Sequence, residues 1–271
     1  MSAARLEITI LGCGSSGGVP RSDGQWGACD PDEPRNRRSR CSLLARRIQG
    51  QGPHTTVLID TAPELRLQCL AAGVEHLDAV LYTHDHADQT AGVDDLRAFF
   101  LGSRVRTPCY MDAATRETFG TRFAYIFQDK PYYPGICEMR DLPPLGEPWA
   151  VEGPSGPLPV LGFDQDHGSM RSVGYRLGPV AYSSDVVGLP EASFAALEGV
   201  EVWIVDALWF RSHPTHANVE MALGWIERVR PKRAILTNLH HDLDYRSLAA
   251  QLPEGVEPAY DGLTLDLALE G

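Results

Sequence analysis

The sequence lacks the features of a membrane protein or of a disulfide-stabilised secreted protein. No apolar run approaches the roughly 20 residues that a membrane-spanning helix requires. The first residues, Met1 to Glu7, contain no apolar core of a signal peptide. The six cysteines are scattered, and no two of them form a Cys-x-x-Cys pair, which favours free thiols in a reducing compartment. We therefore expect a cytoplasmic protein with no membrane partner.

Positive charge is also scarce. The chain has 24 Lys and Arg against 36 Asp and Glu, and its net charge is −12 with His neutral. Because general nucleic-acid binding depends on basic side chains that neutralise phosphates, this balance argues against a stable nucleic-acid partner. The chain has 271 residues, of which 43% are hydrophobic, and this is enough for one sizeable core. With no evident linker or repeat, we expect a single domain over residues 1–271.

The most informative stretch is residues 80–89, Val-Leu-Tyr-Thr-His-Asp-His-Ala-Asp-Gln. Its first four residues indicate a buried strand, and His84, His86 and Asp88 then follow at alternate positions. Alternate residues of an extended segment share a face. Imidazole and carboxylate are ligands for zinc, manganese or iron. We predict that His84 and His86 bind one metal ion, with Asp88 binding that ion or a second one. The alternative is a polar loop after a buried strand, which a lone histidine would favour.

This stretch resembles the His-x-His-x-Asp-His signature of the metallo-β-lactamase superfamily, except that Gln89 stands in place of the last histidine. The resemblance implies that His167 is a third metal ligand and that Asp185 is the carboxylate that bridges two ions. Asn238 stands where the superfamily usually has its final metal histidine. Both histidines of the second ion are thus replaced by amides, which are weaker zinc ligands but are acceptable to manganese or magnesium.

A replacement ligand for the second ion is available in the same segment. His240 lies two residues after Asn238, and on a strand it would share the face of Asn238. His241 would point the other way unless the strand has already ended. The resemblance thus implies one or two divalent ions, zinc or manganese. The first-ion ligands are His84, His86, His167 and Asp185, and the second-ion ligands are Asp88, Asp185 and His240.

The segment His-Pro-Thr-His at residues 213–216 precedes an expected helix over 217–229. It resembles the C–P lyase pathway phosphodiesterase that opens 5-phosphoribosyl 1,2-cyclic phosphate. A histidine of that family acts here on the phosphate or the leaving group, which implies a catalytic and substrate-binding role for His216, with His213 beside it. An imidazole pKa near 6.5 suits proton donation to a leaving alkoxide, and a helix N-terminus suits an anion. The alternative is a helix-capping turn.

Four arginines fall within the six positions 35–40 of this acidic chain. Guanidinium groups pair bidentately with phosphate, so we predict that Arg37, Arg38 and Arg40 contact an anionic substrate. The alternative is a solvated loop.

The order of the expected elements completes the prediction. Strands are expected over 6–11, 41–46, 55–59, 104–112, 160–169, 179–185, 200–206 and 232–242, and helices over 64–72, 113–127 and 217–229. Asp60, after the third strand, is implied to support a metal-binding histidine. Together with the resemblance, this order implies an α/β fold, a four-layer αββα sandwich of two mixed β-sheets.

The implied function is metal-dependent hydrolysis. The protein would be a phosphodiesterase for a small cyclic or ribose-linked phosphate, in which a metal-bound hydroxide attacks phosphorus. The implied catalytic residues are Asp88, His213 and His216. Another hydrolase of this fold (a lactonase, thioesterase or nuclease) stays open, as does a non-catalytic binding or carrier protein with a degenerate second metal site. A small phosphate-bearing molecule is the expected partner, and a homodimer is left open.

Overall fold

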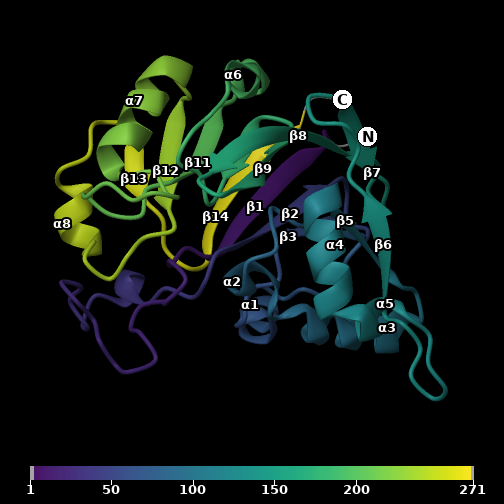
Figure 1. Cartoon of the computed structure of the whole chain (residues 1–271). Coiled ribbons are helices and arrows are strands. Elements are labelled where there is room, and N and C mark those ends of the chain that lie inside the picture. The colour runs from purple at the N-terminus through teal and green to yellow at the C-terminus, as the bar shows by residue number, and fades with distance from the viewer. Residues whose placement is uncertain (1–2, 270–271) are drawn as a thin grey trace.

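The computed structural model describes residues 3–269, and the outermost positions of the predicted single domain, 1–2 and 270–271, lie outside the described residues. Two seven-stranded sheets pack face to face, with helices on their outer sides (Figure 1). The strand order is β14-β1-β2-β3-β4-β5-β6 in the first sheet and β13-β12-β11-β10-β9-β8-β7 in the second. The predicted αββα sandwich is therefore confirmed.

The first sheet mixes antiparallel and parallel pairs. Strands β1, β2 and β3 are antiparallel neighbours, whereas β3 to β6 run parallel. Its strands are β1 (Arg5–Gly12), β2 (Ser42–Ile48), β3 (Thr55–Ile59), β4 (Ala79–Leu81), β5 (Thr107–Met111), β6 (Cys137–Asp141) and β14 (Leu263–Ala268).

The second sheet is mixed in the same way. Strands β7 to β10 are antiparallel neighbours, and β10 to β13 run parallel. Its strands are β7 (Pro148–Val151), β8 (Leu158–His167), β9 (Met170–Leu177), β10 (Val180–Ser183), β11 (Val202–Asp206), β12 (Arg233–Thr237) and β13 (Val256–Pro258).

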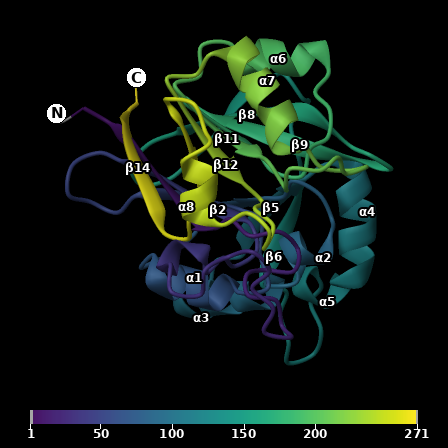
Figure 2. The same ribbon diagram turned by 90° about the vertical axis from the view of Figure 1, so that its left-hand side faces the viewer.

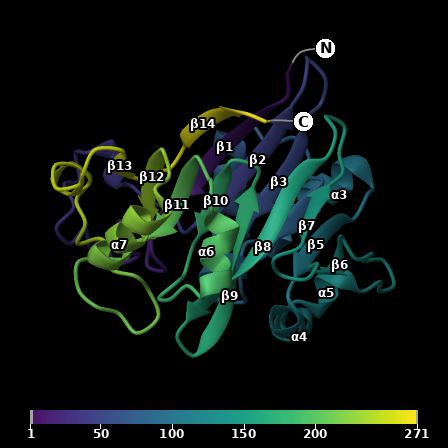
Figure 3. The same ribbon diagram turned by 90° about the horizontal axis from the view of Figure 1, so that it is seen from above.

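The helices divide between the two outer faces. Helices α1 to α5 lie over the first sheet and α6 to α8 over the second (Figure 2), and α6 and α7 lie in front of the second sheet in the view of Figure 3. The helices are α1 (Leu65–Ala71), α2 (Ala87–Thr90), α3 (Arg97–Ser103), α4 (Ala113–Arg122), α5 (Ala124–Phe127), α6 (Glu191–Leu197), α7 (Val219–Val229) and α8 (Tyr245–Ala249). No helix among residues 3–269 is long and apolar enough to cross a membrane.

Alternation along the strands builds three apolar layers. In β1, Leu6, Ile8 and Ile10 face the second sheet and pack in one cluster with Tyr182 and Ile204. A second cluster joins the outer face of the first sheet to α1, α3, α4 and α5, and a third joins the second sheet to α6, α7 and α8. Because successive side chains of a strand point to opposite faces of the sheet, a short apolar strand contributes to the layers on both sides.

The predicted elements are largely confirmed, with two local differences. The helix expected over 113–127 is divided into α4 and α5 at Phe123, whose φ of −117° interrupts the helix. The strand expected over 232–242 ends at Thr237, because Asn238 adopts a left-handed φ of 61°. Asp60 and Asp185 follow their own strands in the same conformation, with φ of 62° and 53°. Asp and Asn tolerate this region better than other side chains, and three such residues just after strands mark sharp turns at that edge.

Candidate metal centre

Four side chains that could hold a metal ion converge where three strands end. His84 and His86 follow β4, His167 ends β8, and Asp185 follows β10. Their ligand atoms all lie within 4.8 Å of one another. His84, His167 and Asp185 are buried, whereas His86 is exposed, so the group opens to solvent beside His86. The structure thus brings together the four side chains predicted for the first ion.

The hydrogen bonds of His84 direct one ring nitrogen into the group. Its Nδ1 lies 2.9 Å from the Thr83 hydroxyl, which in turn lies 2.8 Å from Asp60 Oδ2. The Thr83 hydroxyl donates its one proton to Asp60 Oδ2, so it accepts from His84 Nδ1. The Nε2 atom of His84 is buried and finds no hydrogen-bond partner among residues 3–269. A buried nitrogen in this state is costly unless a ligand occupies it.

His167 is oriented in the same way by a backbone group. Its Nδ1 donates to the Thr215 carbonyl over 2.7 Å, so its Nε2 presents a lone pair to the group, 3.3 Å from His86 Nδ1. Asp185 Oδ2 lies 3.6 Å from His84 Nε2 and 3.7 Å from His167 Nε2. Nitrogen ligands 2.0–2.1 Å from a tetrahedral zinc ion are about 3.4 Å apart. The four residues therefore fit one divalent ion in identity, spacing and ring orientation.

Electrostatics keep the two buried histidines in the neutral form that binds metals. Burial lowers the pKa of His84 to about 3, although Asp185 opposes the change. Burial also lowers the pKa of His167. A metal-binding imidazole must be deprotonated at the ligating nitrogen, so neither histidine has to lose a proton to bind an ion near neutral pH.

Asp88, in the first turn of α2, lies beside this group. Burial and the charge of Asp185 raise the pKa of Asp88 to about 6, and His86 and His216 oppose the change. Within the described part of the chain, however, Asp88 does not join the four residues whose ligand atoms lie within 4.8 Å. Its carboxylate is a neighbour of the candidate ion rather than one of the four side chains that converge on it.

His216 lies against the metal group and is held by a buried carboxylate. Its Nδ1 donates to Asp206 Oδ2 over 2.8 Å, and its Nε2 lies 3.9 Å from Asp185 Oδ2. Burial disfavours the charged ring, but Asp206, Asp185 and Asp88 outweigh burial and raise the pKa of His216 to about 9. His213 is one layer further out, with its ring centroid 5.1 Å from that of His216.

The structure corrects the prediction for His240. Because β12 ends at Thr237 and Asn238 has a positive φ, strand alternation does not carry His240 to the face of Asn238. Its Nε2 lies 3.3 Å from an Arg21 Nη atom, and its Nδ1 lies 3.3 Å from Asp242 Oδ2. His240 therefore belongs to a separate group with His241 and Asp242, and it does not replace a ligand of the second ion.

The predicted arginine clamp divides into three different environments. Arg38 is only 2% exposed, and its guanidinium donates to Asn36 Oδ1 and to the His240 carbonyl. This burial corrects the prediction for Arg38, which fixes the loop from within instead of reaching solvent. Arg40 pairs with Glu64 at 2.8 Å. Arg37 is exposed with its guanidinium 5.0 Å from the ring centre of Trp26, and substrate contact by Arg37 or Arg40 stays a prediction.

Sequence reasoning missed three supporting residues: Thr83, Asp206 and Thr215. Asp206 is the last residue of a fully buried strand, next to two parallel strands whose ends already supplied candidate ligands. That position is a usable signal, because parallel strands bring their carboxyl ends to one edge. The support expected from Asp60 does exist, but it passes through Thr83. Thr215 acts through its backbone carbonyl, so its side-chain type gives no indication of this contact in the sequence.

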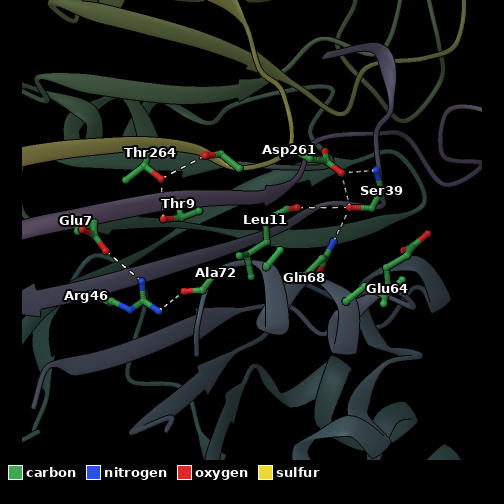
Figure 4. A pocket seen from close by; sticks show the side chains of 13 residues that line it. Glu7, Thr9, Leu11, Ser39, Arg46, Glu64, Gln68, Ala72, Asp261 and Thr264 are labelled. Carbon is green, nitrogen blue, oxygen red and sulfur yellow. Dashed lines mark hydrogen bonds and ion pairs between the residues drawn. The ribbon is translucent and has the colours of Figure 1, made fainter. Parts of the chain in front are cut away.

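A separate hollow of about 520 Å³ lies on the outer face of the first sheet, beside α1 (Figure 4). Arg46 pairs with Glu7 across one end of it, and Gln68 donates to Ser39 at the other. None of the four candidate metal ligands lines it. It is therefore not part of the candidate metal centre.

Comparison with known proteins agrees with this architecture. The family model described as "Beta-lactamase superfamily domain" matches residues 55–240, which include all four candidate ligands. With two facing mixed sheets and a His/Asp cluster at their edge, the chain belongs to the metallo-β-lactamase superfamily.

Three individual proteins are similar to this chain over most of its length. A crystal structure described as a new diphosphatase from the PhnP family is 32% identical, with a TM-score of 0.86 over 98% of this chain and 99% of that chain. Zn²⁺-bound PqqB from Methylobacterium extorquens is 18% identical, with a TM-score of 0.71 over 96% of this chain and 100% of that chain, and shows the shared fold. An octanoyltransferase of Porphyromonas gingivalis is 30% identical over 266 residues, or 95% of this chain. The chain spans about half (51%) of the length of that curated relative.

Proposed function

We propose that the protein is a metal-dependent hydrolase of small phosphodiesters or related phosphoanhydrides. The observation that carries the proposal is His216, a histidine held by Asp206 with its free Nε2 3.9 Å from a candidate metal ligand. Phosphate ester hydrolysis needs a positive centre for the phosphate oxygens and an acid for the leaving oxygen. The diphosphatase similarity supports the same substrate class.

The hydrogen bonds and positions of these residues support separate roles for them as metal ligands, acid and base. His84, His86, His167 and Asp185 would hold a divalent ion, which would activate water and offset charge on the phosphate oxygens. The Nδ1–H of His216 donates a hydrogen bond to Asp206, so the Nε2 proton of the charged ring faces the site and can pass to the leaving oxygen. Asp88, whose pKa is raised to about 6, is a nearby carboxylate that can take a proton from the attacking water.

A row of side chains leads outward from His216, and we propose that the rest of the substrate lies along it. The ring centroids of His213 and Trp209 are 6.1 Å apart, and those of Trp209 and His240 are 4.8 Å apart. Arg21 continues the row through its contact with His240. Aromatic faces followed by a guanidinium suit a sugar or base with a second anionic group, so we propose that Arg21 and the exposed Arg37 contact that group.

The test compares phosphodiesters whose leaving groups differ in how much they depend on protonation by an acid. Protein loaded with Mn²⁺ or Zn²⁺ is assayed on an alkyl phosphodiester and on bis(p-nitrophenyl) phosphate, whose leaving group departs without protonation. A lactone and a thioester serve as comparison substrates. His216→Gln should lower turnover of the alkyl ester by about 10²–10⁴-fold and that of the nitrophenyl ester much less.

The matched control is His76→Gln, because His76 is half-buried beside Asp78 and belongs to no candidate ligand group. This variant should retain full activity on both phosphodiesters. Faster turnover of the lactone or thioester than of either phosphodiester would overturn the proposal. An equal decrease in the turnover of both phosphodiesters in His216→Gln would show that His216 is not the acid.

A further inference from the structure

The two oxygens of Asp185 have different surroundings. Oδ2 faces the ring nitrogens of His84, His167 and His216. Oδ1 faces the other way and accepts from Ser184 Oγ at 2.7 Å. Two amides also donate to Oδ1, Asn238 Nδ2 at 3.2 Å and Gln89 Nε2 at 3.3 Å. These four residues are at most 2% exposed, so the arrangement is sealed from water.

Three donors saturate Oδ1. A carboxylate oxygen offers about two lone-pair sites, and an amide nitrogen can only donate. A carboxylate that bridges two ions gives one oxygen to each, with the ions about 3.5–4 Å apart. A second ion would therefore have to displace Gln89 and Asn238 from Oδ1. It would also leave their buried N–H groups without acceptors, at about 1–3 kcal/mol for each group.

The backbone holds both amides at this oxygen. Asn238 follows β12 in the left-handed conformation, with φ of 61°. Gln89 lies in α2, where its carbonyl accepts from the Thr61 amide. The same Asn238 nitrogen lies 3.1 Å from His216 Nδ1, so this amide contacts both the candidate ligand and the candidate acid. These contacts fix the backbone positions from which both amides reach Oδ1.

We propose that the protein has a single-ion centre, in which Gln89 and Asn238 occupy the place of a second ion and position Asp185. His84, His86, His167 and Asp185 Oδ2 hold the one ion. With their N–H groups directed at Oδ1, the two amides present no lone pair there to another ion, although the resemblance implied one. The two amides are positioning residues, since they act through Asp185.

This inference deepens the proposed function by fixing the metal centre on which that function depends. The number of bound ions is measured without a substrate. A protein that binds one ion and hydrolyses no phosphodiester would refute the function alone, and one that hydrolyses a phosphodiester with two ions would refute the inference alone.

The experiment counts Mn²⁺ ions per chain. Protein purified without chelator is titrated with Mn²⁺ and examined by elemental analysis, native mass spectrometry and EPR. The unmodified protein should saturate at one ion and give the hyperfine-resolved spectrum of an isolated Mn²⁺. The variant Gln89→His with Asn238→His should bind two ions whose spectra show spin coupling at about 4 Å. Gln68→His, which adds a histidine at another buried glutamine, should bind one.

An isosteric variant keeps the test decisive if the double variant does not fold. Gln89→Glu places a carboxylate against Asp185 Oδ1, so a second equivalent of Mn²⁺ should raise its melting temperature and leave that of the unmodified protein unchanged. Two ions in the unmodified protein would overturn the inference. A folded double variant that still binds one ion, or no metal binding at all, would also overturn it.

Discussion

Replacing Thr83 by valine tests the hydrogen-bonded chain that orients the first metal ligand. The Thr83 hydroxyl is buried, donates to Asp60 Oδ2 and accepts from His84 Nδ1. Valine keeps the shape and removes both bonds. Two buried polar groups then lack partners, at about 1–3 kcal/mol each, so we expect a loss of about 2–6 kcal/mol in the free energy of unfolding.

The same substitution should weaken metal binding. Groups that orient a metal-binding histidine typically contribute 10–100-fold to metal affinity, so the Kd of Thr83→Val for Zn²⁺ should rise by about that factor. Two assays separate the effects: urea unfolding of the metal-free protein, and competition for Zn²⁺ against a chromophoric chelator.

Thr55→Val is the matched control. Its hydroxyl is also buried and makes two hydrogen bonds, donating to the Gly156 carbonyl and accepting from the Ser155 amide, but it lies at the start of β3, away from the histidines. We expect a comparable stability loss with unchanged Zn²⁺ affinity. A wild-type Kd in Thr83→Val would refute the inferred role of this chain, because the ring of His84 would then be oriented without it.

Three further predictions follow. Asp206→Asn should lower the pKa of His216 from about 9 toward its ordinary value, because the ring loses its hydrogen-bonded carboxylate. Activity that needs the protonated ring is then lost at lower pH, so the alkaline limb of the pH profile of kcat should move in the acid direction. An alkaline limb that does not move would contradict this prediction. Arg38→Met should cost about 1–3 kcal/mol in urea unfolding, because the loop of residues 21–40 loses its buried donor, whereas the exposed Arg37→Met should cost less than about 0.5 kcal/mol. Adding Zn²⁺ at about 100 times its Kd should stabilise the metal-free protein by about 2.7 kcal/mol, or about 5 °C in Tm, and an unchanged Tm would mean that the four residues hold no ion.

The parts of the fold and site that could be predicted from sequence depend on local patterns. Apolar strands such as 55–59 and 200–206 carry their own signal, and the ligands stand at the ends of strands or just after them. His84 and His86 were predictable because two histidines and a carboxylate alternate within five residues. The superfamily resemblance then located His167 and Asp185, each of which alone would be an ordinary polar residue.

The errors arise where tertiary structure overrides a local pattern. The left-handed turn at Asn238 ends β12, so alternation gave the wrong face for His240. Arg38 lies in a polar stretch, yet it is buried because the loop folds back onto the His240 carbonyl. In the sequence, Gln89 and Asn238 stand at positions where metal-binding histidines are expected. Their shared hydrogen bonds to Asp185 Oδ1 are visible only in the structure.

The most direct test of the account is a titration of metal-free protein with Mn²⁺ while hydrolysis of a phosphodiester is followed. We predict that turnover rises in proportion to added ion and reaches its maximum at one equivalent per chain. Turnover that begins only after the first equivalent is bound would contradict the single-ion centre. The absence of turnover at any metal content would contradict the proposed hydrolase activity.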